Sequence, residues 1–236
     1  MAFLFQRLND VTIEEVRVSD GEEVLDVGCG RAIDIIRIAK GGVSCCGLEP
    51  SKRMINYAKE RINESGIEVG LVQGIGEYLP FKDCSLDKVV CKGALDHFPH
   101  PAKATEEIAR VLKPHGKAIF TIANFESLGF RLGKRLFARG NNSDRKKMWE
   151  IPSDHTHKFD YRNLKSLVEH RFRVEKAIGV SLLFGLPGWS SLLSRLPKSV
   201  SSAALNILDK IAHRLPSLSD AVILRCSPKP VSECSH

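Results

Sequence analysis

Short apolar runs alternate regularly with longer helical patterns through the first half of the chain. Five runs rich in β-branched and other apolar residues are typical of strands: EEVLDVG, GVSCCGLE, IEVGLVQG, LDKVVCKG and GKAIFTIA. Their nearly continuous apolar character suits strands covered on both faces, as in a parallel sheet. Helical patterns lie between them at residues 32–40, 51–65 and 102–112, with Ser51 as a cap and Gly66 as a stop. This alternation predicts an α/β fold with right-handed crossovers and a doubly wound sheet.

The regular alternation of apolar runs and helical patterns ends in the second half of the chain. Residues 124–158 form a basic segment without a clear strand, and residues 159–171 have a helical pattern. Two further strands are expected at 173–180 and 221–226, which brings the predicted sheet to seven mostly parallel strands with helices on both faces.

Residues 177–194, AIGVSLLFGLPGWSSLLS, carry no charge and reach the length of a membrane-span candidate. Gly185, Pro187 and Gly188 would break a single helix near its middle and leave backbone groups unpaired in lipid. We therefore expect two short apolar pieces around a Leu-Pro-Gly turn, which either cover a core or a pocket or lie in a membrane interface.

The sharpest local signal follows the first strand. There Asp26 precedes Gly28-Cys29-Gly30-Arg31-Ala32, and a helix comes next. Glycines at a strand-to-helix turn let the backbone bend sharply and approach a ligand closely, while the helix N-terminus offers unpaired N–H groups. Glu49 ends the second run 21 residues after Gly28, where an acidic side chain can bind both hydroxyls of a ribose. These features predict a cofactor that contains a nucleoside.

The third small residue of the turn bears on the identity of that cofactor. A dinucleotide fingerprint requires Gly or Ala at position 33, where Ile33 would crowd the helix against the strand. The small residue here is Ala32. With GEYLPF downstream and KPHG before a strand, the pattern DxGxGxA resembles the class I S-adenosylmethionine-dependent methyltransferases over residues 22–123, and the remainder resembles them only in strand order. The resemblance implies a Rossmann-like fold and S-adenosyl-L-methionine as cofactor.

The resemblance also implies roles for individual residues. Asp26, Gly28 and Gly30 match the motif that surrounds the methionine part of the cofactor, and Glu49 matches the acidic residue that holds the ribose. Further residues expected to line the cofactor are Cys29, Pro50, Ile75, Gly76, Glu77 and Cys91.

One position departs from the family pattern. The family usually has Gly-Asp-Ala-Glu before Leu-Pro-Phe, and its Asp bonds the adenine amino group, whereas this chain has Gly74-Ile75-Gly76-Glu77. Because Ile75 cannot make that bond, we expect it to pack on the ring while a backbone group or Glu77 meets the amino group.

Methyl transfer from a sulfonium is an in-line displacement, so the protein mainly aligns the reactants and excludes water. A hydroxyl acceptor would benefit from a general base. The candidates are His97, in the LDHFPHP loop after the fourth strand, and His155 and His157, in the DHTH sequence before the 159–171 helix. The alternatives are a structural role for His97 and an inert surface loop for the other two. Lys92 is either a substrate contact or an exposed side chain, and no metal site is predicted.

Charge is distributed unevenly along the chain. The first 120 residues contain 16 basic and 18 acidic side chains, and the remaining residues contain 19 and 10. The basic segment and the uncharged segment both fall where the family inserts substrate-binding elements. They predict a small-molecule or lipid-like acceptor with an anionic part, O-methylation slightly ahead of N- or C-methylation, and a peripheral membrane contact. Few aromatic residues accompany the basic ones, which disfavours a nucleic-acid partner.

Other functions stay open. A cofactor-binding scaffold that does not catalyse is favoured by Ile75 and Ala32, an RNA methyltransferase is a further alternative, and a nicotinamide oxidoreductase is disfavoured by Ile33. The sequence does not determine the oligomeric state.

The domain organisation follows from these segments. We expect an N-terminal helical segment at 1–21, the cofactor-binding core at 22–123, and the remainder of the same domain at 124–226 with substrate-side insertions at 124–158 and 181–220. Residues 227–236 are expected to be a disordered tail. Seven cysteines without CxxC spacing, and no evident export signal, predict a cytoplasmic location, with peripheral attachment at the inner membrane surface as an open alternative.

Overall fold

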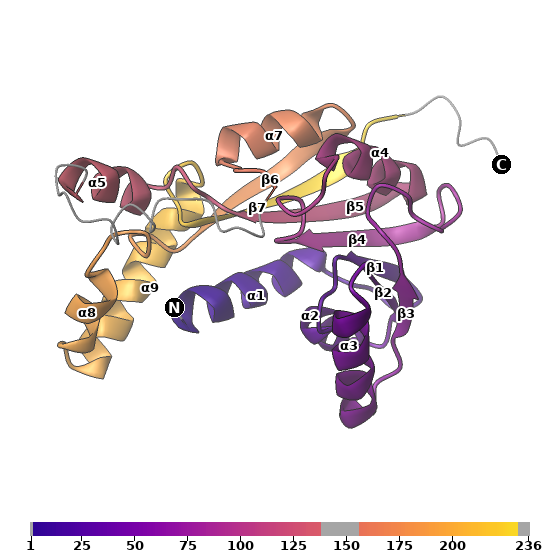
Figure 1. Cartoon of the computed structure of the whole chain (residues 1–236), viewed down its shortest axis with the longest axis horizontal. Coiled ribbons are helices and arrows are strands. Elements are labelled where there is room, and N and C mark those ends of the chain that lie inside the picture. Colours follow the sequence, from indigo (N-terminus) through magenta and orange to yellow (C-terminus); the bar gives the residue numbers. More distant parts are fainter. Residues whose placement is uncertain (1, 138–155, 231–236) are drawn as a thin grey trace.

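The strands form one sheet in the order β3-β2-β1-β4-β5-β7-β6, and the computed structural model describes residues 2–137 and 156–230 (Figure 1). β7 is antiparallel to both of its neighbours, and the other pairs are parallel. This arrangement confirms the predicted doubly wound, mostly parallel sheet of seven strands. The strands are β1 (Glu23–Val27), β2 (Ser44–Glu49), β3 (Gly70–Gln73), β4 (Leu86–Lys92), β5 (Leu112–Ala123), β6 (Phe172–Val180) and β7 (Ala221–Pro228).

Helices cover both faces of the sheet. Figure 1 shows α4 and α7 on one side, α1, α2 and α3 on the other, and α5, α8 and α9 grouped beyond the β5–β7–β6 side. The helices are α1 (Ala2–Val16), α2 (Ile33–Ala39), α3 (Lys52–Ser65), α4 (Pro101–Val111), α5 (Leu128–Phe137), α7 (Tyr161–Glu169), α8 (Trp189–Ser194) and α9 (Lys198–Arg214).

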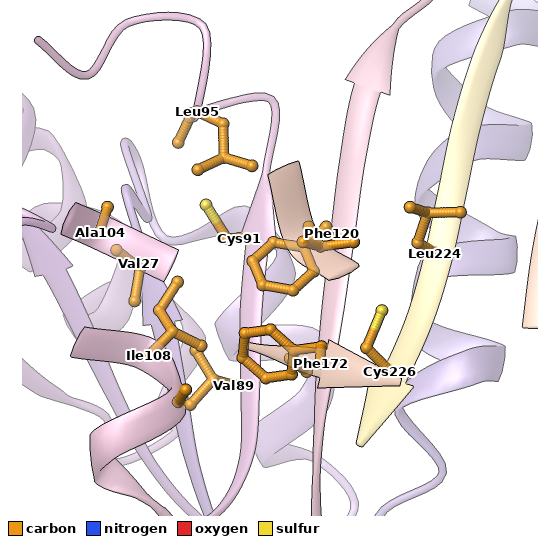
Figure 2. Packing of buried hydrophobic residues seen from close by; sticks show 14 of the residues in the cluster. Val27, Val89, Cys91, Leu95, Ala104, Ile108, Phe120, Phe172, Leu224 and Cys226 are labelled. Carbon is orange, nitrogen blue, oxygen red and sulfur yellow. The ribbon is translucent and has the colours of Figure 1, made fainter. Parts of the chain in front are cut away.

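Each face of the sheet has its own apolar core. Between the sheet and α4 with α7, the rings of Phe120 and Phe172 meet edge to face with centroids 5.3 Å apart, and Ile108 packs in the same cluster (Figure 2). On the other face, Ile35 and Ala58 pack from α2 and α3. Strands covered on both sides are why the predicted runs are apolar almost without interruption.

The first half follows the predicted boundaries closely. The Ser51 hydroxyl accepts from Met54 N at the start of α3, and Gly66 ends the helix at φ 65°. β5 begins at Leu112 instead of residue 116, because the chain becomes extended directly after α4 and Leu112 pairs with Leu86 before a register irregularity.

The second half differs more from the prediction. The sequence pattern did not indicate α5 or α9. Residues 177–194 are the end of β6, a turn at Leu186–Gly188 and α8, as the two-piece interpretation predicted. No helix in the described ranges is long and apolar enough to cross a membrane.

The predicted C-terminal tail begins too early. β7 continues to Pro228, which pairs with Phe172, so Ser227 belongs to the sheet. Lys229 N also donates to Arg171 O at 2.8 Å, and the last part of the predicted tail, residues 231–236, lies outside the described residues. The division of the chain into a core and substrate-side insertions stays a prediction.

Candidate functional site

Three left-handed residues at alternate positions form the turn between β1 and α2. Gly28, Gly30 and Ala32 have φ of 79°, 53° and 58°. A Cβ on Gly28 would lie 2.6 Å from the Ala94 Cβ, so the turn packs tightly on the chain after β4. A Cβ on Gly30 would meet nothing within 4 Å. The backbone at Gly30 is therefore open to close approach by a ligand, as the glycine pattern predicted.

The expectation that Ile33 would crowd α2 against the strand is wrong. Ile33 is 43% exposed, while Ala32 is fully buried. Ala32 directly precedes the helix in a left-handed conformation, which places Ile33 on the outside of the first turn. The methyl group that contacts the core is that of Ala32.

The Glu49 carboxylate ties the turn to the end of β2. Its Oε2 accepts from Gly30 N at 3.0 Å and its Oε1 accepts from Ser51 N at 2.9 Å. A carboxylate oxygen can accept more than one hydrogen bond, so both oxygens retain capacity toward two adjacent hydroxyls. The side chain is buried, which strengthens such bonds.

Two further carboxyl groups gather beside the turn. Asp26 is 4% exposed at the end of β1, and Asp34 lies in the first turn of α2. Burial, followed by the nearby Asp34 charge, raises the pKa of Asp26 to about 7, although Lys92 acts in the opposite direction. Lys92 forms an ion pair with Asp34 and donates to Asn9 Oδ1 of α1 at 2.6 Å. The site therefore gathers the carboxyl groups of Asp26, Asp34 and Glu49 near the Lys92 ammonium group.

Asp34 is the functional candidate that the sequence did not reveal. Its Oδ1 is buried without a hydrogen-bond partner among the described residues, which leaves an acceptor for a cationic ligand. An acidic residue in the first turn of a helix is ordinarily explained by the helix dipole, so no sequence signal distinguishes it. Lys92 is not a freely exposed side chain, because it pairs with this carboxylate, and its contact with a substrate stays a prediction.

Cys29 and Cys91 direct their side chains into the fold. A Cβ on Gly47 of β2 would lie 2.6 Å from Cys29 Sγ, and Cys91 is fully buried beside Leu95 and Phe120 (Figure 2). Burial raises the pKa of both thiols. Any contact of these two residues with a ligand at the sheet edge would have to be made by backbone.

The loop after β3 presents Ile75 at the surface. Ile75 is 45% exposed, and a Cβ on Gly76 would lie 2.7 Å from the Phe98 ring. The buried Glu77 accepts from His100 N at 3.1 Å, so it joins this loop to the loop after β4. Pro50 is exposed at the end of β2, and its carbonyl accepts from Gln73 at 3.2 Å. An exposed Ile75 fits the prediction that it packs on a ring.

Two of the three candidate histidines, His97 and His157, belong to segments that are in contact at the loop after β4. The backbone N atoms of Thr156 and His157 donate to Asp96 O at 2.8 and 3.0 Å. His157 Nε2 lies 3.3 Å from Pro99 O, and the exposed His97 is next to Asp96 in the same loop. The structure thus brings 156–157 onto the 93–100 loop, although about 60 residues separate them. His155 lies outside the described residues.

A polar hollow of about 280 Å³ opens at the end of β5. In it the Arg131 guanidinium donates to the Glu126 carbonyl at 2.7 Å, and Arg162 is exposed at the start of α7. The two guanidinium groups lie with the carboxyl groups of Glu126 and Asp160, so the hollow suits a polar group on a ligand. The hollow is lined by Asn124, Glu126, Arg131, Asp160, Tyr161, Arg162, Ser217 and Leu218.

Comparisons with known proteins agree with this geometry. Residues 25–120 match the methyltransferase domain family. The chain is 38% identical to the uncharacterized methyltransferase YcgJ of Bacillus subtilis over 95 residues, which are 40% of this chain and 38% of the relative. It is 37% identical to a ubiquinone biosynthesis O-methyltransferase of Salmonella paratyphi A over 105 residues, 44% of this chain and 43% of the relative. The chain thus matches about two fifths of the length of these curated relatives.

The structural likeness extends further than the sequence likeness. The crystal structure of the Bacillus subtilis YcgJ protein superposes with a TM-score of 0.62 at 21% identity, covering 95% of this chain and 98% of that one. At this identity the superposition supports the fold alone. The superposition agrees with the matched sequence, the Gly28–Ala32 turn and the Glu49 carboxylate. Residues 25–120 therefore form a methyltransferase domain of the class I S-adenosylmethionine-dependent family, whose cofactor is S-adenosyl-L-methionine.

Proposed function

We propose that the whole chain transfers a methyl group from S-adenosyl-L-methionine to a small or lipid-like acceptor that has an anionic part. The observation that carries this proposal is the contact of Glu49 with Gly30 N beside open backbone, next to a buried acidic cluster. That combination offers acceptors for ribose hydroxyls and negative charge for a cationic cofactor.

The residues present fit the cofactor. Glu49 would hold the ribose, and Ile75 would cover the adenine ring. Asp26 and Asp34 would face the positive charges of the methionine part, for which the unpartnered Asp34 Oδ1 is a ready acceptor. When bound, the cofactor supplies an activated methyl group on sulfur. The protein's part is to orient the acceptor and exclude water.

The acceptor side is proposed from the loop after β4 and the second half of the chain. His97 and His157 are the candidate bases for a hydroxyl acceptor, because residues 156–157 are hydrogen-bonded to the loop that carries His97. The basic excess of the second half, to which Arg131 and Arg162 belong, favours an acceptor with an anionic group. The name of the ubiquinone biosynthesis O-methyltransferase relative supports an oxygen acceptor. Peripheral contact with a membrane belongs to the same proposal, since a lipid-like acceptor would be collected there.

Transfer of label tests the proposal. The protein is incubated with S-adenosylmethionine labelled on the methyl group and with cell extract, and the extract is separated into lipid, small-molecule, RNA and protein fractions. We expect label in the lipid or small-molecule fraction, and none with Glu49→Ala. Label in RNA would favour an RNA methyltransferase instead.

A second experiment addresses the alternatives in which the chain does not transfer methyl groups. Binding of S-adenosylhomocysteine, read as thermal stabilisation, together with no label in any fraction would favour the scaffold, which the exposed Ile75 in place of a carboxylate already suggests. Stabilisation by NAD but not by S-adenosylhomocysteine would contradict the cofactor assignment.

A further inference from the structure

The outer face of α9 is apolar. Val200, Ile207 and Ile211 are 50%, 59% and 43% exposed, and their spacing of seven and four residues places them on one face of the helix. The opposite face buries Asp209 and Ala212, and α9 packs against β6. Beside it, Leu192 of α8 and Leu196 are exposed as well. We call these residues, together with the exposed basic side chains of α8, α9 and the segment between them, the α8–α9 face.

Every charged side chain that residues 189–214 expose is basic. Asp209 is the single acidic residue of this segment, and it is 4% exposed and bonded to Arg7 of α1 at 2.7 Å. Lys210 and Arg214 run along one flank of the apolar stripe, because both lie near Ile207 and Ile211 at helical spacing. The other exposed basic side chains are Arg195 and Lys198.

A hollow of about 690 Å³ lies between α1 and α9 within this face. Its wall combines the apolar groups Ile207 and Ile211 with the basic groups Lys210 and Arg214 and with the Arg7–Asp209 ion pair. Figure 1 shows α8 and the first part of α9 extending away from the sheet, near the N-terminal end of α1. The face is therefore both accessible and hollowed.

We propose that the α8–α9 face docks on the surface of an anionic lipid bilayer. The apolar stripe would enter the boundary between headgroups and acyl chains, and Lys210 and Arg214 would meet lipid phosphates. Charge complementarity selects this occupant: pairing of two copies would oppose like basic charges across the apolar stripe. The inference rests on the proposed function for its purpose, access to a lipid-like acceptor, but vesicle binding needs neither cofactor nor acceptor.

Sedimentation with vesicles tests the inference. The full chain is mixed with phosphatidylcholine vesicles that do or do not contain phosphatidylglycerol, at low and high salt. We expect binding to the anionic vesicles alone, weakened by salt. Since each basic side chain near an anionic surface contributes about 1 kcal/mol, or about fivefold, Lys210→Ala with Arg214→Ala should weaken binding about 25-fold. Ile207→Asn with Ile211→Asn should weaken it at least about tenfold.

Matched variants elsewhere on the surface control for charge and polarity. Lys40→Ala with Lys59→Ala, on exposed positions after α2 and in α3, removes the same charge, and Leu136→Asn replaces a 66% exposed residue of α5. Both should bind vesicles like the unaltered chain. Stabilisation by S-adenosylhomocysteine verifies that every variant is folded.

Three results would overturn the inference: equal binding to both kinds of vesicle, equal losses in the control variants, or a dimer that Ile207→Asn with Ile211→Asn dissociates in sedimentation velocity. The last result would assign the face to a second copy. If vesicles bind but label is not transferred from the cofactor, the proposed function fails while the docking surface stands, and the reverse outcome separates them equally.

Discussion

The helices α3 and α9 are both amphipathic, but they differ in which side chains they bury. α3 buries Ile55 and Ala58 and turns its charged residues to solvent. α9 buries a carboxylate, Asp209, and leaves isoleucines exposed. α3 thus follows the usual rule of apolar residues inside. α9 is attached by a polar clamp at Asp209 and keeps apolar side chains exposed.

The polar clamp consists of the hydrogen bonds that the Asp209 carboxylate accepts. Its Oδ1 accepts from Ser181 N at 3.0 Å, just after β6, and its Oδ2 accepts from Arg7 Nε at 2.7 Å. One side chain therefore joins α9, α1 and the end of β6. The difference between the two helices teaches that α3 is held by apolar packing, while buried polar contacts help to position α9.

The largest expected effect is a difference in stability between substitutions of the buried Ile55 of α3 and the exposed Ile207 of α9. Ile55→Asn on α3 should lower the free energy of unfolding by about 4 kcal/mol, because it removes buried apolar contacts and buries an amide. Ile207→Asn on α9 should change it by less than about 0.5 kcal/mol, since the side chain is exposed. Urea unfolding of both variants measures the contrast. Similar losses in the two would show that the outer face of α9 is covered.

The second largest effect is expected from removing the Asp209 carboxylate. Asp209→Ala should cost about 3 kcal/mol, because it leaves Ser181 N without its acceptor and Arg7 without its partner. Glu60→Ala, an exposed carboxylate of α3, should cost less than about 0.5 kcal/mol in the same urea titration. If the two variants are equally stable, α9 is held by something other than this contact.

Cofactor affinity should depend on the first half alone. Glu49→Gln places an amide N–H₂ against either Gly30 N or Ser51 N, so we expect binding of S-adenosylhomocysteine to weaken by about 2 kcal/mol, or about 30-fold. Lys210→Gln on α9 should leave it unchanged. Calorimetric titration measures both. A weaker affinity in the Lys210 variant would mean that the halves are coupled through α1.

The smallest change in cofactor affinity is expected from the pH dependence of the acidic cluster. The pKa of Asp26 is raised to about 7, so the folded protein favours its protonated form. The stability that this preference contributes is complete below about pH 4 and is lost as the pH rises through about 7. The cationic cofactor should bind the ionised form better, with affinity rising up to about tenfold over the same range.

Asp26→Asn provides the control for this titration. It should flatten both pH profiles, because the asparagine side chain does not ionise. No matching change is expected from Asp209→Asn in the second half, so the two variants together show which carboxylate is responsible. A wild-type affinity that is constant from pH 5 to about 8 would exclude Asp26 as the titrating group.

The sequence predicted the fold of the first half well because its signals are local. The apolar runs determine the strands, Ser51 and Gly66 bound α3, and the turn needs glycine or another residue tolerant of left-handed backbone. The prediction failed at the start of α2, where the local pattern allowed either of two adjacent residues to be the buried one. Ile33 was expected to crowd the core, yet Ala32 takes the buried position and Ile33 the outside of the helix.

The amino-acid sequence by itself determined the doubly wound sheet, the Gly28–Ala32 turn and the acidic residue at the end of β2, because hydrophobic periodicity and backbone freedom act over a few residues. Only the tertiary structure paired Lys92 with Asp34, hydrogen-bonded residues 156–157 to the loop after β4 and turned the isoleucines of α9 outward. Those contacts join segments far apart in the chain, and burial of one group against another is decided when the whole sheet assembles.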